Sequence, residues 1–178
     1  QDSRRKLKQV YHLFQFIEKL LLELPDEGRH ASLADHGAGK SYLGFIIFDL
    51  FFRARGGDGH DGHVYGIETR SELVSRSREL AARLGFDRMS FLNLSVAEAT
   101  GAAELPERID VVTALHACDT ATDDAIAFGL AKKARFMVLV PCCQAEVAAC
   151  LRLDKALSLS RAPLAEVGGD PPHTDEMR

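Results

Sequence analysis

The sequence places an acid directly before a glycine-rich turn and a second acid at the end of the next apolar segment. Asp35 precedes Gly37 and Gly39, and Glu68 closes the segment 64–68. Glycine lets a backbone approach a ligand closely, and an acid at the end of a second strand can accept hydrogen bonds from the hydroxyls of a ribose. These residue types in this order predict a binding site for a nucleotide-like cofactor.

A second set of reactive side chains follows two later apolar segments, 109–115 and 136–140. The set comprises His116, Cys118, Asp119, Cys142 and Cys143. If the two segments are neighbouring parallel strands, the side chains after them face one cleft, because ligands bind beyond the carboxyl ends of such strands. The sequence therefore predicts that His116, Cys118 and Cys142 are catalytic.

Four roles remain open for this set. In a substrate pocket, His116 acts as a general base, because imidazole titrates near neutral pH. In covalent catalysis, a Cys118 thiolate attacks a carbon of a nucleobase, with Cys142 as the second cysteine. In a zinc site, His116 and the three cysteines are ligands, but adjacent cysteines suit a tetrahedral site poorly, so we predict no metal. In the fourth role the cysteines only pack in the core.

The segment 34–41, Ala-Asp-His-Gly-Ala-Gly-Lys-Ser, also approximates the phosphate-binding P-loop pattern G-x-x-x-x-G-K-[ST]. In that alternative Lys40 holds phosphate and Ser41 holds Mg²⁺. Asp35 argues against it, because a carboxylate inside an anion-binding loop is electrostatically unfavourable. A P-loop nucleotide hydrolase is therefore the less favoured alternative.

The elements that must position these residues alternate between helix and strand. An amphipathic helix is predicted at 4–24, where apolar residues recur at three- and four-residue steps. The elements expected after it are strand 31–34, helix 40–53, strand 64–68, helix 71–84, strand 89–94, strand 109–115, a helix starting at 122, strand 136–140 and helix 144–157. This alternation predicts an α/β fold with a doubly wound, mostly parallel sheet that is covered on both faces.

The pattern Asp-x-Gly-x-Gly at 35–39, with Glu68 and the strand order, resembles the class I S-adenosylmethionine (SAM)-dependent methyltransferases over residues 30–150. The resemblance implies a Rossmann-like fold, SAM as cofactor and methyl transfer as the activity. His-Ala-Cys-Asp at 116–119 and Pro-Cys-Cys at 141–143 narrow it to a subfamily. That subfamily is similar to the methyltransferase-like region of glutathione S-transferase C-terminal-domain-containing proteins, and it makes RNA a candidate acceptor.

The resemblance also implies a role for each residue around the cofactor. Gly37 and Gly39 pass close to the methionine and ribose portions of SAM, Asp35 orients its amino end, and Glu68 binds the ribose hydroxyls.

Further along the chain, Ser95 stands where the family often has an aspartate that contacts the adenine amine, so this contact is weaker here. Val96 contributes backbone and packing contacts, and His116 approaches the methyl group.

The sequence departs from the family pattern at two places. Lys40 and Ser41 stand where many relatives carry a third small residue, and 158–178 cannot supply the antiparallel strand pair with which relatives usually end. We therefore expect a fold without a complete C-terminal strand pair. A fragment of a longer chain fits this departure, and so does a module that binds SAM or a partner without catalysis.

We expect a single domain over 1–178, made of the helix at 4–24, a cofactor-binding core at 30–157 and an irregular tail at 158–178.

Composition restricts the partners and the compartment. The chain has 178 residues and a formal net charge of −4, so it offers no global electrostatic footprint for nucleic acid. Binding to RNA would depend on a local patch, such as the basic residues within 4–8, or on a domain outside this chain. The longest apolar stretch, 42–52, is too short for a transmembrane helix, so we expect no membrane partner. Four cysteines, two of them adjacent, suggest no disulfide framework and predict a cytoplasmic protein.

Overall fold

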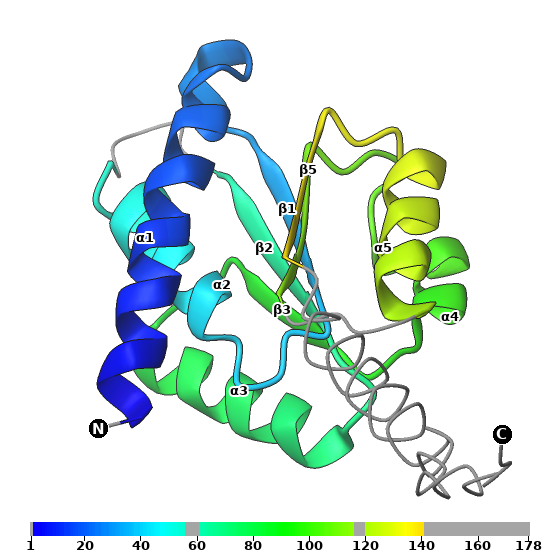
Figure 1. Ribbon diagram of the computed structural model, residues 1–178, viewed down its shortest axis with the longest axis horizontal. Helices are drawn as coiled ribbons and strands as arrows, with labels where there is room; N and C mark the ends of the chain where they lie inside the picture. Colours follow the sequence, from blue (N-terminus) through cyan, green and yellow to red (C-terminus); the bar gives the residue numbers. More distant parts are fainter. Residues whose placement is uncertain (1, 56–60, 116–119, 141–178) are drawn as a thin grey trace, which may run out of the picture. The chain divides into compact units, whose positions relative to one another are not determined.

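Five parallel strands form one sheet in the computed structural model (Figure 1). The structure describes residues 2–55, 61–115 and 120–140, and their side chains from Lys8 onward except that of Thr120. These residues all belong to one compact unit, Gln1–Cys143. The strands are β1 (Ser32–His36), β2 (His63–Ile67), β3 (Met89–Leu92), β4 (Val111–Leu115) and β5 (Phe136–Val140), in the spatial order β3-β2-β1-β4-β5. This order, with every pair parallel, confirms the predicted doubly wound α/β sheet.

Strand β1 lies in the middle of the sheet and pairs with both β2 and β4. His36, its last residue, is in register with Ile67 on one side and Ala114 on the other. The carboxyl ends of the three strands therefore meet at one edge. The chain leaves β1 toward β2 and later crosses to β4 on the opposite side, so the switch point for ligand binding lies between β1 and β4.

Helices cover both faces of the sheet (Figure 1). On one face, α1 (Asp2–Leu22), α2 (Tyr42–Ile47) and α3 (Ser71–Leu84) pack over a large apolar cluster. The other face carries α4 (Val96–Gly101) and α5 (Thr120–Ala131) over a smaller cluster. Two short turns, η1 (Pro25–Gly28) and η2 (Phe48–Arg53), complete the described elements.

The larger cluster explains why α1 forms where the sequence predicts a helix. Phe14, Ile17 and Leu21 recur at steps of three and four residues, so they share one face, and all three are buried. They meet the phenylalanines of η2, of which Phe51 and Phe52 are almost fully buried. Burial of a Phe or Leu side chain contributes about 1.5–3 kcal/mol, so this cluster supplies much of the stability of the first layer.

The structure corrects several predicted boundaries. Strand β1 extends two residues beyond the expected end, so Asp35 and His36 belong to the strand and the turn starts at Gly37. The predicted helix 40–53 is an α-helical segment followed by a π-helical turn, in which the Ala54 N–H donates to the Asp49 carbonyl five residues back.

Two further elements differ from the prediction, and two expectations remain untested. Helix α4 was missed because it is only six residues long and carries little apolar periodicity. Helix α5 begins at Thr120, two residues before the expected start. The expected helix at 144–157 and the tail at 158–178 lie outside the described residues.

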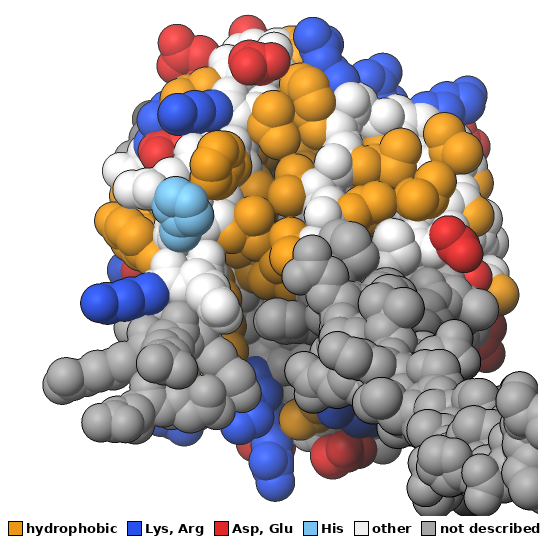
Figure 2. Space-filling view, in the orientation of Figure 1, with side chains coloured by type: hydrophobic (Ala, Val, Ile, Leu, Met, Phe, Trp, Pro, Cys, Tyr) orange, Lys and Arg blue, Asp and Glu red, His pale blue; other side chains and the backbone are white. Residues whose placement is uncertain are grey.

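In the described part of the chain, β5 is an edge strand with much of its apolar surface open. Met137 and Val140 are 37% and 38% exposed, and Leu130 at the end of α5 is 66% exposed. Figure 2 shows hydrophobic side chains gathered on the face that is viewed in both figures. Among the described helices, none is long and apolar enough to span a membrane.

Candidate functional site

Asp35 and His36 end β1 and point to opposite faces of the sheet, because side chains alternate along a strand. Asp35 faces Thr113 of β4, whose hydroxyl donates a hydrogen bond to Asp35 Oδ1 at 2.7 Å. His36 lies against Phe128 of α5, with ring centroids 4.3 Å apart in an edge-to-face arrangement. The central strand therefore delivers an acid to one helical layer and an imidazole to the other, both at the switch point of the sheet.

The chain turns sharply after β1 and needs glycine to do so. Gly37 and Gly39 have φ values of +60° and +58°, a left-handed conformation that residues with a Cβ adopt at a cost. A Cβ built on Gly37 would meet no atom within 4 Å, so this part of the turn borders open space. The Ala38 N–H donates to the Ile67 carbonyl at 3.1 Å, which holds the turn against the end of β2. The turn therefore offers bare backbone to a ligand at the end of the sheet.

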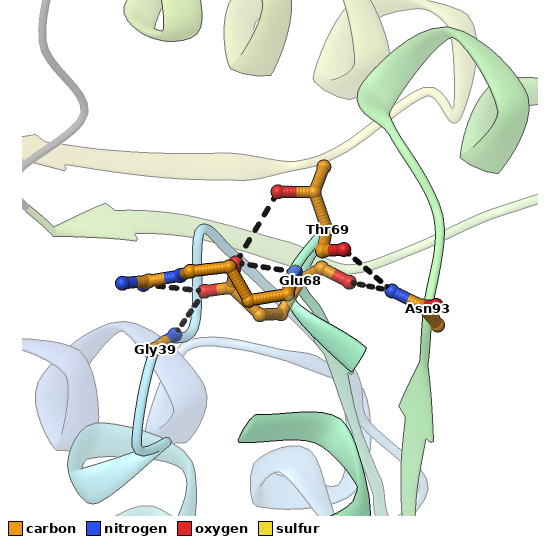
Figure 3. A network of polar contacts seen from close by, with 5 residues as sticks. Gly39, Glu68, Thr69 and Asn93 are labelled. Atoms are coloured by element: carbon orange, nitrogen blue, oxygen red, sulfur yellow. Dashed lines mark hydrogen bonds and ion pairs between the residues drawn. The ribbon is translucent and has the colours of Figure 1, made fainter. Parts of the chain in front are cut away.

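Glu68, directly after β2, binds this turn (Figure 3). The Gly39 N–H donates to Glu68 Oε2 at 2.8 Å. Arg70 donates to the same carboxylate three times, from its backbone N–H and Nε to Oε1 at 3.1 Å each, and from Nη2 to Oε2 at 3.0 Å. The Thr69 hydroxyl adds a longer contact to Oε1 at 3.4 Å. The predicted ribose acid therefore touches the predicted glycine turn, as the resemblance requires.

Asn93 holds the backbone that carries Glu68. Its Nδ2 donates to the carbonyl oxygens of Glu68 and Thr69 at 3.0 and 2.8 Å (Figure 3). The Glu68 N–H in turn donates to the Leu92 carbonyl at 3.1 Å. The backbone around Glu68 is thus fixed from β3, which leaves the side chain of the acid a narrow range of positions.

The pKa values of the two acids of the site are shifted in opposite directions. Burial raises the pKa of Asp35 to about 7; the Thr113 hydrogen bond opposes this and the charge of Glu68 adds to it. Burial would also raise the pKa of Glu68, but hydrogen bonds from Arg70 and Gly39 outweigh it and hold that pKa at about 2. At neutral pH Glu68 is fully ionised, while Asp35 is divided between its neutral and ionised forms.

His36 is a buried imidazole, and neither of its ring nitrogens has a hydrogen-bond partner among the described residues. It is 2% exposed, and its burial lowers its pKa to about 4, so the ring is neutral at physiological pH. Buried polar atoms without partners are rare and cost free energy. The sequence offered no signal for this position beyond its place in the turn motif.

Ser95 and Val96 lie at the start of α4. Ser95 is its N-cap: its hydroxyl accepts from the Glu98 N–H and donates to Glu98 Oε2, while its own N–H also donates to Glu98 Oε2. This is a capping box, in which both residues satisfy backbone donors at the helix end. Val96 packs against the smaller apolar cluster. The predicted adenine contact of Ser95 and the cofactor contact of Val96 stay predictions.

The three predicted catalytic residues, His116, Cys118 and Cys142, lie outside the described residues, as do Asp119 and Cys143. The strands that precede them end at Leu115 and Val140, which are register partners in neighbouring parallel strands. This confirms that β4 and β5 are adjacent. The grouping of the reactive side chains that follow them stays a prediction.

Three contributors to the described site were missed in the sequence: Thr113, Arg70 and Asn93. Thr113 is the one polar residue within β4, which is a visible signal, but its pairing with Asp35 depends on a register that the sequence does not contain. Arg70 stands two residues after Glu68, so the sequence alone could have suggested an ion pair between them. Asn93 had no comparable signal.

The contacts of the turn also bear on the two alternatives from the sequence. A P-loop needs backbone N–H groups that are free to hold phosphate, but here the Gly39 N–H binds the Glu68 carboxylate and Lys40 is exposed. Among the described residues, no group of three or more His, Cys, Asp or Glu side chains could hold a metal. The residues of the zinc alternative fall outside that part of the chain.

A family model described as a methyltransferase domain matches residues 5–150 of this chain. No curated protein matches it. Among solved structures it is similar to TrmK of M. capricolum in complex with S-adenosyl-homocysteine (12% identity, TM-score 0.45, 61% of this chain and 44% of that chain). It is also similar to a putative sarcosine dimethylglycine methyltransferase from Galdieria sulphuraria (14% identity, TM-score 0.48, 73% and 43%). The chain thus spans less than half of each of these proteins.

Proposed function

Because this chain belongs to the family of methyltransferase domains, we propose that it transfers the methyl group of SAM to a nucleophilic atom of an acceptor molecule. SAM is the cofactor of this fold, and its sulfonium supplies an activated methyl group, so the protein contributes mainly orientation. The observation that carries the proposal is the placement of Glu68 beside the Gly37–Gly39 turn, at the carboxyl end of β2.

The described residues fit such a cofactor. Open space beside Gly37 leaves room for a ligand to lie against the backbone, and the φ values of Gly37 and Gly39 keep side chains out of it. Glu68 is ionised and fixed, which suits an acceptor for two ribose hydroxyls. Asp35 can take a negative charge near neutral pH, which suits a partner for the amino end of the cofactor. We assign these four residues to cofactor binding, with Ser95 and Val96 beside the adenine.

His116, Cys118 and Cys142 are the proposed catalytic residues, because they follow the ends of two adjacent strands, β4 and β5. His116 acts as general base or orients the acceptor, and the cysteines shape the pocket. We infer a cytoplasmic location from the small number of cysteines and the adjacent pair.

RNA is the first acceptor class to test, because the motifs at 116–119 and 141–143 resemble a subfamily for which RNA is a candidate. The net charge of −4 means that affinity for RNA has to come from a local patch or from another domain. Protein is the second class to test.

Calorimetry of the purified chain with SAM tests the cofactor assignment. Glu68→Gln should weaken SAM binding about ten- to a hundredfold, because a hydrogen bond to a charged group contributes about 1.5–3 kcal/mol. Glu79→Gln, an equal change at an exposed position of α3, should leave it unaltered. Binding of ATP–Mg²⁺ without binding of SAM would overturn the proposal in favour of a nucleotide hydrolase.

Transfer of labelled methyl from SAM to cellular RNA or protein fractions tests the activity itself. Label in one fraction identifies the acceptor class, and its loss in His116→Ala supports the catalytic assignment. SAM binding without transfer to any fraction would indicate a module that binds SAM without catalysis.

A further inference from the structure

The Glu68 carboxylate has no acceptor capacity left for a ligand. Two carboxylate oxygens offer about four lone-pair positions. Five donors already occupy them: the backbone N–H groups of Gly39 and Arg70, the Thr69 hydroxyl, and Nε and Nη2 of Arg70. Two ribose hydroxyls can bind this carboxylate at its present occupancy only if two of these donors leave.

The donors differ in how easily they can leave. The N–H groups of Gly39 and Arg70 belong to backbone that is held by the turn after β1 and by the Asn93 contacts. The Arg70 guanidinium, by contrast, belongs to a side chain that is 59% exposed, whereas the Glu68 side chain is 7% exposed. A partly solvated arginine can swing into water at small cost, since exposed ion pairs are weak. The Thr69 hydroxyl makes the longest contact, but it is a single donor, whereas the Arg70 guanidinium supplies two. The Arg70 side chain is therefore the group that gives way to a pair of ribose hydroxyls.

The geometry of the Arg70 contact matches what a ribose would make. Nε donates to one oxygen of Glu68 and Nη2 to the other, so the guanidinium presents two adjacent donors to the two oxygens. Two neighbouring ribose hydroxyls present the same pair of donors. Nη2 also approaches the ligand side of the turn, lying 3.7 Å from the position of a Cβ built on Gly39.

We propose that Arg70 competes with the ribose hydroxyls of the cofactor for Glu68 and thereby sets the cofactor affinity of the site. The inference rests on the proposed function, because it requires that Glu68 binds ribose. In the free protein Arg70 keeps Glu68 ionised and fixed in place; in the bound protein its side chain turns into solvent. The apparent affinity equals the intrinsic affinity multiplied by the fraction of molecules in which Arg70 has released Glu68.

The test measures binding of S-adenosylhomocysteine by calorimetry, since this ligand carries no sulfonium charge. Arg70→Ala should bind it about three- to tenfold more tightly than the wild type, as expected when a weak exposed ion pair no longer competes. Arg76→Ala removes the same charge from an exposed position on α3 and should change nothing. Arg70→Gln keeps a neutral amide donor, so its affinity should lie between those of the wild type and Arg70→Ala. Thermal unfolding of each variant checks that it is folded.

Salt gives a second readout of the same competition. Raising the NaCl concentration screens the Arg70–Glu68 pair, whose guanidinium is exposed, so binding by the wild type should tighten while binding by Arg70→Ala stays constant. Weaker or unaltered binding by Arg70→Ala, with the wild type still binding, would overturn the role of Arg70 and leave the proposed function standing. Absence of binding in both folded proteins would overturn the proposed function, and the competition with it.

Discussion

Asp35 and Glu68 lie at the carboxyl ends of neighbouring strands of one sheet, yet the pKa values of their carboxyl groups are shifted in opposite directions. Glu68 receives five hydrogen bonds, and its pKa falls to about 2. From the described residues Asp35 receives one, from Thr113, and burial raises its pKa to about 7. The sheet puts both acids at the ligand-binding edge, but burial dominates the pKa of Asp35 and hydrogen-bond donors lower that of Glu68. One acid is therefore a permanent anion, and the other can gain or lose its proton near neutral pH.

The largest expected effect is on stability, from Asp35→Asn. The folded-state pKa of Asp35 lies above its ordinary value of 3.8, so the wild type loses stability as pH rises from 3.8 through 7. Asparagine does not titrate and escapes this loss. At 1.36 kcal/mol for each pH unit, the advantage of the variant should grow by about 4 kcal/mol between pH 4 and pH 8. Urea unfolding at both pH values measures it.

Glu68→Gln should change stability in the opposite direction to Asp35→Asn. The pKa of Glu68 is lowered, so its ionised form stabilises the fold above the ordinary pKa, and the variant should be less stable than the wild type at pH 8. If both substitutions shift stability in the same direction at pH 8, the claim that the two pKa values are shifted in opposite directions is wrong.

His36→Leu extends the comparison to the other face of β1. The pKa of His36 is lowered by burial to about 4, so the wild type loses stability as pH falls from 6.5 toward 4, where the unfolded chain takes up the proton first. The loss is on the order of 3 kcal/mol, and leucine abolishes it. Leucine also removes two buried nitrogens that have no partner in the described part of the chain, so it should stabilise the protein at pH 7 as well. A pH series of thermal unfolding measures both effects; an unaltered acid slope would show that other groups cause it.

Cofactor binding offers a smaller and more specific readout of Asp35. A protonated carboxyl cannot pair with a cationic amino group, so SAM affinity should rise about tenfold between pH 6 and pH 8 as Asp35 loses its proton at a pKa near 7. The rise should be absent from Asp35→Asn, measured by calorimetry at the same pH values. An equal rise in both proteins would assign it to the ligand or to another residue.

The same residues show which features of the site can be predicted from the sequence and which cannot. The strand order and the meeting of Glu68 with the glycine turn were predictable, because apolar runs alternate with helices and glycines punctuate them. The charge states of Asp35, Glu68 and His36 were not predictable. The hydroxyl that reaches Asp35 comes from Thr113, 78 positions away in the chain, and only the register of β1 against β4 brings the two together. The apolar surroundings of His36 likewise depend on the packing of Phe128 from α5, which no local pattern encodes.

Ser95 is the reverse case, in which a local pattern was present and was assigned another role. Ser95 and Glu98 have the spacing of a capping box, and the structure contains that box at the start of α4. Because the Ser95 hydroxyl already accepts a hydrogen bond from the Glu98 N–H, Ser95→Ala should cost about 1 kcal/mol of stability and change SAM affinity little. Ser95→Asp, which also caps helices, should restore the stability. Chemical unfolding and calorimetry of both variants separate the roles: a clear loss of SAM affinity in Ser95→Ala that Ser95→Asp recovers would show that Ser95 contacts the adenine after all.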